Sequence, residues 1–149
     1  MKEAVVVDST CLIGLERIGR LDLLPGLFDP IIAPSEVSRE FGSSLPWLKI
    51  EEPSNKSFIA ALKLLVDDGE AEAIALATEK QFRIVTDDRQ ARNVAQQLNL
   101  SIIGTIGILV KAKQIQIIPA IKPLINDLES NGFFLSPALK AQALAITGE

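Results

Sequence analysis

The sequence contains no histidine, no tyrosine and only one cysteine, Cys11. Without histidine the chain cannot build a Ser-His-Asp or Cys-His catalytic site, and it lacks the imidazole ligands that zinc, copper and iron commonly use. One cysteine cannot form an internal disulfide or a cysteine-rich metal site, and it is typical of a reducing compartment. If the chain is an enzyme, we expect its reactive groups to be carboxylates, hydroxyls, lysines or a bound ion.

Positive charge is also scarce, and the N-terminus carries no long apolar run. The formal net charge is −4 at pH 7, so we do not expect a strongly basic surface for non-specific nucleic-acid binding. The first apolar stretch, residues 4–7, stops at Asp8, so it is neither a signal peptide nor a membrane span. These features predict a cytoplasmic protein that does not enter a membrane.

Length and hydrophobicity favour a single domain. The chain has 149 residues, and 48% of them are hydrophobic, which is too many for a disordered chain. A domain of this length buries roughly 70% of the surface that its unfolded chain exposes, enough for a core without disulfides or metal ions. We therefore expect residues 1–149 to form one domain, in which two C-terminal helices within residues 121–149 either pack on the core or form a dimer interface.

Short apolar runs alternate with helical patterns along the chain. The predicted strands cover residues 4–7, 30–33, 47–50, 82–86 and 100–103, and the predicted helices cover residues 11–19, 21–28, 34–41, 56–66, 70–80, 89–98, 106–114, 121–130 and 136–146. This alternation predicts an α/β fold in which helices cover both faces of a central, mainly parallel sheet of about five strands.

Acidic residues follow two of the predicted strands: Asp8 after the first, and Asp87 and Asp88 after the fourth. The carboxyl ends of parallel strands lie at one edge of a sheet, where α/β proteins bind their ligands. Glu40 and Glu70, on neighbouring helices, could reach the same edge. A histidine-free group of carboxylates suits hard cations such as Mg²⁺ or Mn²⁺, which activate water and stabilise charge during phosphodiester hydrolysis.

Each acid also has a simpler explanation. Asp at a strand-to-helix junction is often an N-cap, and the helix dipole favours negative charge where Glu70 lies. The adjacent carboxylates of Asp87 and Asp88 repel each other, a cost that a divalent cation between the acids would offset. The joint pattern indicates an acidic metal site, while each acid taken alone is equally compatible with a cap or a solvated surface group.

Two stretches in the first third of the chain resemble signatures of PIN-domain proteins. VVVDSTCLIGLERIG is similar to the opening of that family, where a strand ends on an Asp, here Asp8, with a small hydroxyl residue two positions later, here Thr10. APSEVSREF resembles the second element, in which a Glu precedes an apolar residue. This resemblance places Glu40, rather than Glu36, in the site.

Two further stretches follow in the family's order. DDGEAEAIALA resembles its third, acidic helix and puts Glu70 at a position where the family often has Asp. VTDDRQAR resembles its fourth signature, a strand followed by Thr-x-Asp. In this pattern Asp88 is the site residue, and Asp87 is its neighbour in the sequence. The similarity continues into the tail GFFLSPALKAQAL and so covers nearly the whole chain. The sequence looks like the PIN-like subfamily of predicted nucleic-acid-binding proteins.

The resemblance implies a small three-layer α/β/α sandwich and an endoribonuclease that hydrolyses RNA with Mg²⁺ or Mn²⁺. Asp8, Glu40, Glu70 and Asp88 would be the catalytic residues that hold the metal, and Asp87 would be a further ligand or a hydrogen-bond acceptor next to the ligands. Many members of the family are toxins paired with an antitoxin protein, and many are dimers. An antitoxin partner and a homodimer are therefore further expectations.

Three more side chains are candidates for the same site. Thr10 could orient a metal-bound water, or it could simply cap the following helix. Arg89 and Arg92 follow the acids directly and are candidate RNA contacts. For either arginine alone, a solvated helix face or an ion pair is the simpler explanation.

Two other functions fit parts of the sequence. A catalytically silent PIN-like module could bind RNA or a partner protein through the same cleft, and the acidic net charge would suit that role. A phosphotransferase or phospho-acceptor domain also combines a strand-end Asp with Mg²⁺. However, the first strand ends Asp-Ser-Thr without the Asp-x-Asp of haloacid-type phosphotransferases, and no lysine directly follows the last strand as receiver domains require. The metal-dependent ribonuclease is the leading hypothesis.

Overall fold

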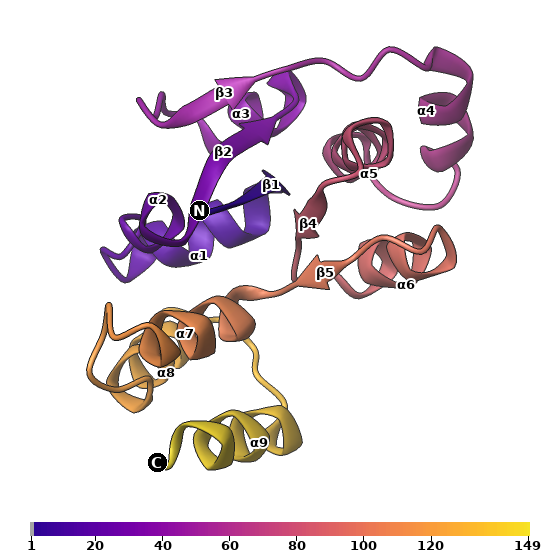
Figure 1. Cartoon of the computed structure of the whole chain (residues 1–149). Coiled ribbons are helices and arrows are strands. Elements are labelled where there is room, and N and C mark those ends of the chain that lie inside the picture. Colours follow the sequence, from indigo (N-terminus) through magenta and orange to yellow (C-terminus); the bar gives the residue numbers. More distant parts are fainter. Residues whose placement is uncertain (1) are drawn as a thin grey trace.

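A five-stranded parallel sheet forms the centre of the computed structural model, which describes residues 2–149 (Figure 1). The strands are β1 (Glu3–Val7), β2 (Phe28–Ala33), β3 (Leu48–Ile50), β4 (Arg83–Val85) and β5 (Ile102–Ile103). They lie in the order β3-β2-β1-β4-β5, and every neighbouring pair is parallel. The predicted α/β fold around a mainly parallel sheet is confirmed.

The strand β1 lies in the middle of the sheet because its sequence is apolar on both faces. Its valines, residues 5–7, are completely buried, as expected for a strand covered by helices on both sides. In the register with β4, Val7 lies beside Val85, and the N–H group of Asp8 donates to the Val85 carbonyl oxygen at 3.1 Å. Asp8 and Thr86, which follow the two strands, are therefore neighbours at the carboxyl edge of the sheet.

The order of the strands reverses between β1 and β4. From β1 the chain builds outward through β2 and β3, and from β4 it builds in the other direction to β5. Such a reversal is the topological switch point of an open α/β sheet, where ligands bind beyond the carboxyl ends of the strands. The topology thus places the residues after β1 and β4 at the position that most often carries function in this class of fold.

Helices cover both faces of the sheet and give the three-layer arrangement (Figure 1). They are α1 (Ser9–Arg17), α2 (Leu23–Leu27), α3 (Ser35–Phe41), α4 (Lys56–Leu62), α5 (Asp68–Lys80), α6 (Arg89–Gln97), α7 (Thr105–Gln114), α8 (Lys122–Ser130) and α9 (Pro137–Thr147). On one face α5 packs against β1 and β4 and contacts α3, α4 and α6, while on the other α7 contacts α1, α2 and α9. Within residues 2–149, no helix has both the length and the apolar character needed to cross a bilayer.

Two predicted helices are shorter in the structure. The helix predicted over residues 21–28 covers only Leu23–Leu27. Phe28 begins β2 instead, because its ring is buried in the core there. The helix predicted over residues 56–66 ends at Leu62, and the chain continues in turns to the cap of the next helix. In both places tertiary packing and capping, rather than the apolar spacing, set the boundary.

Both C-terminal helices pack on the rest of the chain. The helix α8 buries Leu124, Ile125 and Leu128 and contacts α1, and α9 contacts α7. Leu139 and Ile146 of α9 remain exposed. The outer surface of α9 therefore keeps apolar side chains in contact with water.

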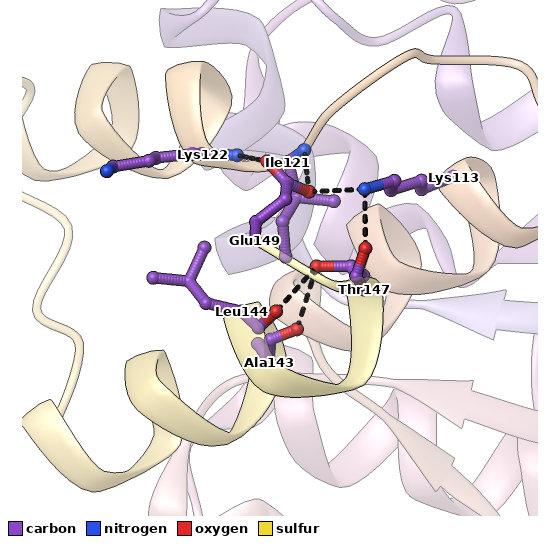
Figure 2. Close-up of polar contacts among 7 residues, drawn as sticks. All are labelled: Lys113, Ile121, Lys122, Ala143, Leu144, Thr147 and Glu149. Atoms are coloured by element: carbon purple, nitrogen blue, oxygen red, sulfur yellow. Dashed lines mark hydrogen bonds and ion pairs between the residues drawn. The ribbon is translucent and has the colours of Figure 1, made fainter.

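The end of α9 is held in place by the side chain of Glu149 (Figure 2). Its carboxylate accepts hydrogen bonds from the backbone N–H groups of Ile121 (2.8 Å) and Lys122 (3.0 Å), and from the ammonium group of Lys113 (3.0 Å). The same ammonium group donates to the carbonyl oxygen of Thr147 at 2.6 Å. These donors, the Ile121 N–H first among them, lower the pKa of Glu149 to about 2. One carboxylate thus joins α7, the start of α8 and the end of α9.

Candidate active site

Asp8 is the most deeply buried acid of the predicted site. It follows β1, is 2% exposed, and caps α1 by accepting a hydrogen bond from the N–H group of Cys11 at 3.3 Å. The hydroxyl groups of Thr10 (2.8 Å) and Thr86 also donate to its carboxylate. Burial raises the pKa of Asp8 to about 7, against the opposing effect of these hydrogen bonds. Asp8, and not Thr10, is therefore the cap, and Thr10 orients the Asp8 carboxylate.

Thr86 connects Asp8 to Asp88 and was not among the predicted site residues. It is completely buried at the end of β4, where its hydroxyl group donates to Asp8 and accepts a hydrogen bond from the N–H group of Asp88 at 3.3 Å. The buried hydroxyl group therefore fixes the Asp8 carboxylate relative to the backbone of Asp88. The available signal in the sequence was its place in the Thr-x-Asp pattern, directly after the apolar strand.

Asp88 and Glu70 form a pair of neighbouring acids. Asp88 caps α6 by accepting a hydrogen bond from the N–H group of Ala91 at 2.9 Å. Glu70 forms a reciprocal capping box at the start of α5, where its N–H group donates to Asp67 (2.8 Å) and its carboxyl group accepts from the Asp67 N–H (3.2 Å). Burial, together with hydrogen-bonding contact to Asp88 and then Asp67, raises the pKa of Glu70 to about 9. The carboxyl group of Glu70 therefore favours its neutral form beside Asp88.

Glu40 reaches toward this pair from α3. Its carboxylate accepts a hydrogen bond from the hydroxyl group of Ser9 at 3.2 Å and lies against Gly69, where an added Cβ atom would be 2.2 Å from a Glu40 oxygen. Burial, and then the charge of Asp67, raises the pKa of Glu40. Glu40 thus lies between the starts of α1 and α5, and its hydrogen-bond partner is Ser9 rather than another acid.

Asp87 is directed away from its neighbour Asp88. Both of its oxygens accept hydrogen bonds from Thr105 at the start of α7, one from the N–H group (2.8 Å) and one from the hydroxyl group (2.5 Å). Burial raises the pKa of Asp87, although the Thr105 hydrogen bonds and then the charge of Arg92 oppose this change. The immediate role of Asp87 is to fix the start of α7.

The two predicted RNA contacts differ in their surroundings. The guanidinium group of Arg92 donates to the carbonyl oxygen of Thr86 at 3.4 Å and lies near Asp87, while Arg89 is exposed on the first turn of α6. Both arginines line a groove of about 690 Å³ that includes Asp87. The groove thus places positive charge next to the acids.

The donor chemistry of these acids suits a hard cation, but the side chains do not form a closed cluster. Within residues 2–149, no three acidic or cysteine side chains are grouped so that they could hold a metal ion. Glu70 and Asp88 form a pair, and Asp8 joins them through the hydroxyl group of Thr86. The acids offer oxygen atoms as donors, and burial is the main reason that the pKa values of Asp8 and Glu70 are raised.

Comparison with known proteins identifies the family of the chain. No curated protein matches it at a significant level. A family model described as a PIN domain matches residues 4–149. This match covers nearly the whole chain and includes every acid of the candidate site. The chain therefore belongs to the PIN-domain family, whose members have a nuclease-like, nucleic-acid-binding role.

Proposed function

We propose that this protein is a Mg²⁺- or Mn²⁺-dependent endoribonuclease. The observation that carries the proposal is the link from Asp8 through Thr86 to Asp88, with Glu70 in contact with Asp88, at the switch point of the sheet. Acids with raised pKa values that gather at such a position are candidates for a functional site. Membership of a nuclease-like family supports the same conclusion.

In this proposal each acid has a separate task. Asp8, Glu70 and Asp88 would hold the ion, and Glu40 would complete the set from α3. When bound, the ion would supply an activated water and positive charge for the scissile phosphate. Thr86 would fix Asp8 and Asp88 relative to one another.

Two further residues would support the ligands. Thr10 is exposed and its hydroxyl group donates to Asp8, so that it would orient a water beside this ligand. Asp87 would act as a hydrogen-bond acceptor outside the ligand set, because Thr105 occupies both of its oxygens. Neither residue needs to bind the ion directly.

The partners are part of the same proposal. Arg89 and Arg92 would bind RNA phosphates, since an arginine fork matches a phosphate group. The exposed apolar surface of α9 lines a groove of about 580 Å³ with α7, which supports a homodimer. The family resemblance further suggests a cytoplasmic toxin with an antitoxin partner. Mass determination in solution tests the dimer, and a monomer at micromolar concentration would contradict it.

The decisive experiment compares RNA cleavage by the wild type with Asp8→Asn and Asp88→Asn. Asparagine is as good an N-cap as aspartate, so both variants are expected to fold. We expect cleavage in Mg²⁺ or Mn²⁺ to be lost in both, together with saturable metal binding in a calorimetric titration. Asp127→Asn, which changes an exposed acid on α8, is the matched control. Equal cleavage by all four proteins would exclude the assigned site.

A catalytically silent module that binds RNA or a protein is the second candidate. It is favoured by the use of Asp8 and Asp88 as helix caps and of Glu70 in a capping box with Asp67, which accounts for these acids without a metal. It predicts RNA or partner binding without cleavage. Metal-dependent cleavage that disappears in Asp88→Asn would exclude it.

A further inference from the structure

The segment between α8 and α9 holds one aromatic side chain in solvent. Phe133 packs on the core and over Gly14 of α1, and its N–H group donates to the Leu128 carbonyl oxygen at 2.9 Å. Leu135 is buried, whereas Phe134 between them is 86% exposed. The two flanking side chains therefore anchor the segment, and Phe134 between them is left in contact with water.

Phe134 lines the groove that includes Asp87. Helix α6 contributes Arg89, Arg92, Asn93 and Gln96 to this groove, and β5 and α7 contribute apolar side chains. Its volume of about 690 Å³ lies within the roughly 300–1,000 Å³ of sites that bind small organic ligands. The groove therefore combines an exposed ring, cations and amide groups in a space of nucleotide size.

The groove has a net positive charge, whereas the whole chain has a net negative charge. Among its lining residues, Arg89 and Arg92 are cationic and Asp87 alone is anionic. The Asp87 carboxylate is already occupied by two hydrogen bonds from Thr105. A local excess of positive charge on a chain of net charge −4 favours an anionic occupant.

A second, smaller hollow lies on the other side of Phe134. It has a volume of about 260 Å³ and is lined by Thr10, Arg17, Phe133 and Phe134, among others. Of its lining residues, Thr10 donates a hydrogen bond to Asp8. Phe134 thus lines two hollows, each of which contains at least one arginine.

We infer that Phe134 stacks on an unpaired base of the RNA substrate and that the groove beside α6 holds the attached nucleotide. The inference deepens the proposed function and rests on it, because it assigns a base-binding side chain and a nucleotide groove to the proposed RNA substrate. The exposed ring supplies a stacking face, Arg89 supplies a phosphate contact, and Asn93 and Gln96 supply donors and acceptors for a base edge. A base paired inside a duplex offers no free face for such stacking.

The test compares Phe134→Ala, Phe134→Leu and Phe134→Trp in the full chain. The probe is a short fluorescein-labelled oligoadenylate, and its abasic counterpart has the same phosphates without bases. Binding is followed by fluorescence anisotropy in EDTA, and again with Mg²⁺ in the cleavage-deficient Asp88→Asn background. Leu64→Ala is the matched control, because Leu64 is also 86% exposed but lies outside both hollows.

We expect Phe134→Ala and Phe134→Leu to weaken oligoadenylate binding by about tenfold or more, the effect of losing one base–aromatic stack. Phe134→Trp should keep wild-type affinity, and Leu64→Ala should have no effect. The abasic strand should bind more weakly to the wild type and be insensitive to Phe134. Thermal unfolding should be the same for all variants, because the altered side chains are exposed.

Three results would overturn the inference while leaving the proposed nuclease intact, provided that Asp88→Asn still abolishes cleavage. They are equal oligoadenylate affinity in all Phe134 variants, equal binding of the abasic and base-carrying strands, and a change of oligomeric state in Phe134→Ala without a change of RNA affinity. The last result would make this face a contact between copies of the chain. A wild type that neither binds nor cleaves RNA would overturn both proposals.

Discussion

The hydroxyl group of Thr86 donates a hydrogen bond to the buried carboxylate of Asp8, across the junction of β1 and β4. The contact exists because the parallel register places Val7 beside Val85, so that the next residue of each strand meets at the edge of the sheet. It stabilises the charged form of an acid that burial would otherwise keep neutral. Thr86 is thus a positioning residue for the proposed site, and it can be tested separately from the acids.

Replacing Thr86 with valine should lower both stability and activity. The change removes a donor from Asp8 and leaves the carboxyl group buried with one partner fewer, which costs about 1–3 kcal/mol of unfolding free energy. The pKa of Asp8 should rise further, so the pH at which cleavage begins should move upward. Urea unfolding and the pH–rate profile measure the two effects. Thr86→Ser, which keeps the hydroxyl group, should restore the profile, and failure to do so would contradict this role.

Asp8 should make the metal-free protein less stable as pH rises. Its pKa is about 7 in the folded chain and lower when unfolded, so between about pH 4 and pH 7 the folded state binds more protons. The contribution of Asp8 to the free energy of unfolding should therefore fall as pH rises through this window, by at most about 4 kcal/mol. Asp8→Asn should remove that part of the pH dependence, measured by urea unfolding in EDTA. Parallel curves for the wild type and the variant would contradict the buried position of Asp8.

Gly69→Ala should impair the site without loosening the fold. The new methyl group would occupy the position of the Glu40 carboxylate and displace that flexible side chain, while alanine favours the helix by about 0.5–1 kcal/mol. We expect lower cleavage at equal or greater thermal stability. In a Glu40→Ala background the same substitution should have no further effect on cleavage. An additional loss there would mean that Gly69 acts through another residue.

Asp87 and Asp88 should separate into a structural acid and a metal-binding acid. Asp87→Asn alters the hydrogen bonds to Thr105 and should reduce stability by about 1–3 kcal/mol, with a small effect on metal affinity. Asp88→Asn should do the reverse, because asparagine still caps α6. Calorimetric metal titration and urea unfolding on both variants decide the assignment. An equal loss of metal affinity in both would make Asp87 a ligand.

The contacts of Glu149 should stabilise the fold only above acidic pH. The pKa of this carboxyl group is lowered to about 2, so its contribution is complete above about pH 4.5 and lost as pH falls toward 2. The difference in unfolding midpoint between the wild type and Glu149→Gln should shrink across that window. Glu16→Gln, at an exposed position of α1, should show no such difference at any pH. A difference that persists at pH 2 would contradict the proposed contacts.

Features that recur along the chain, such as the alternation of strands and helices, could be predicted from the sequence. Contacts that depend on how two strands or helices pair could not. The alternation of strands and helices predicted the sheet, and the positions of Asp8 and Asp88 after two strands predicted that these residues lie at the same edge of it. Thr86 was missed because its partner is fixed only when β1 and β4 pair. Nothing in two adjacent aspartates shows which one turns toward Thr105, because that depends on where α7 begins. The contact between Ser9 and Glu40 likewise depends on how α3 packs beside α1.

The pairing of β1 with β4 also affects how the protein is made. Asp8 and Thr86 are 78 positions apart in the chain, and Glu70 and Asp88 become neighbours only when the segment after α5 is complete. A nascent chain on the ribosome therefore carries Asp8 long before it carries the residues that meet it. If the acids cleave RNA, the growing polypeptide cannot attack the message from which it is translated until the segment through Asp88 has emerged and folded.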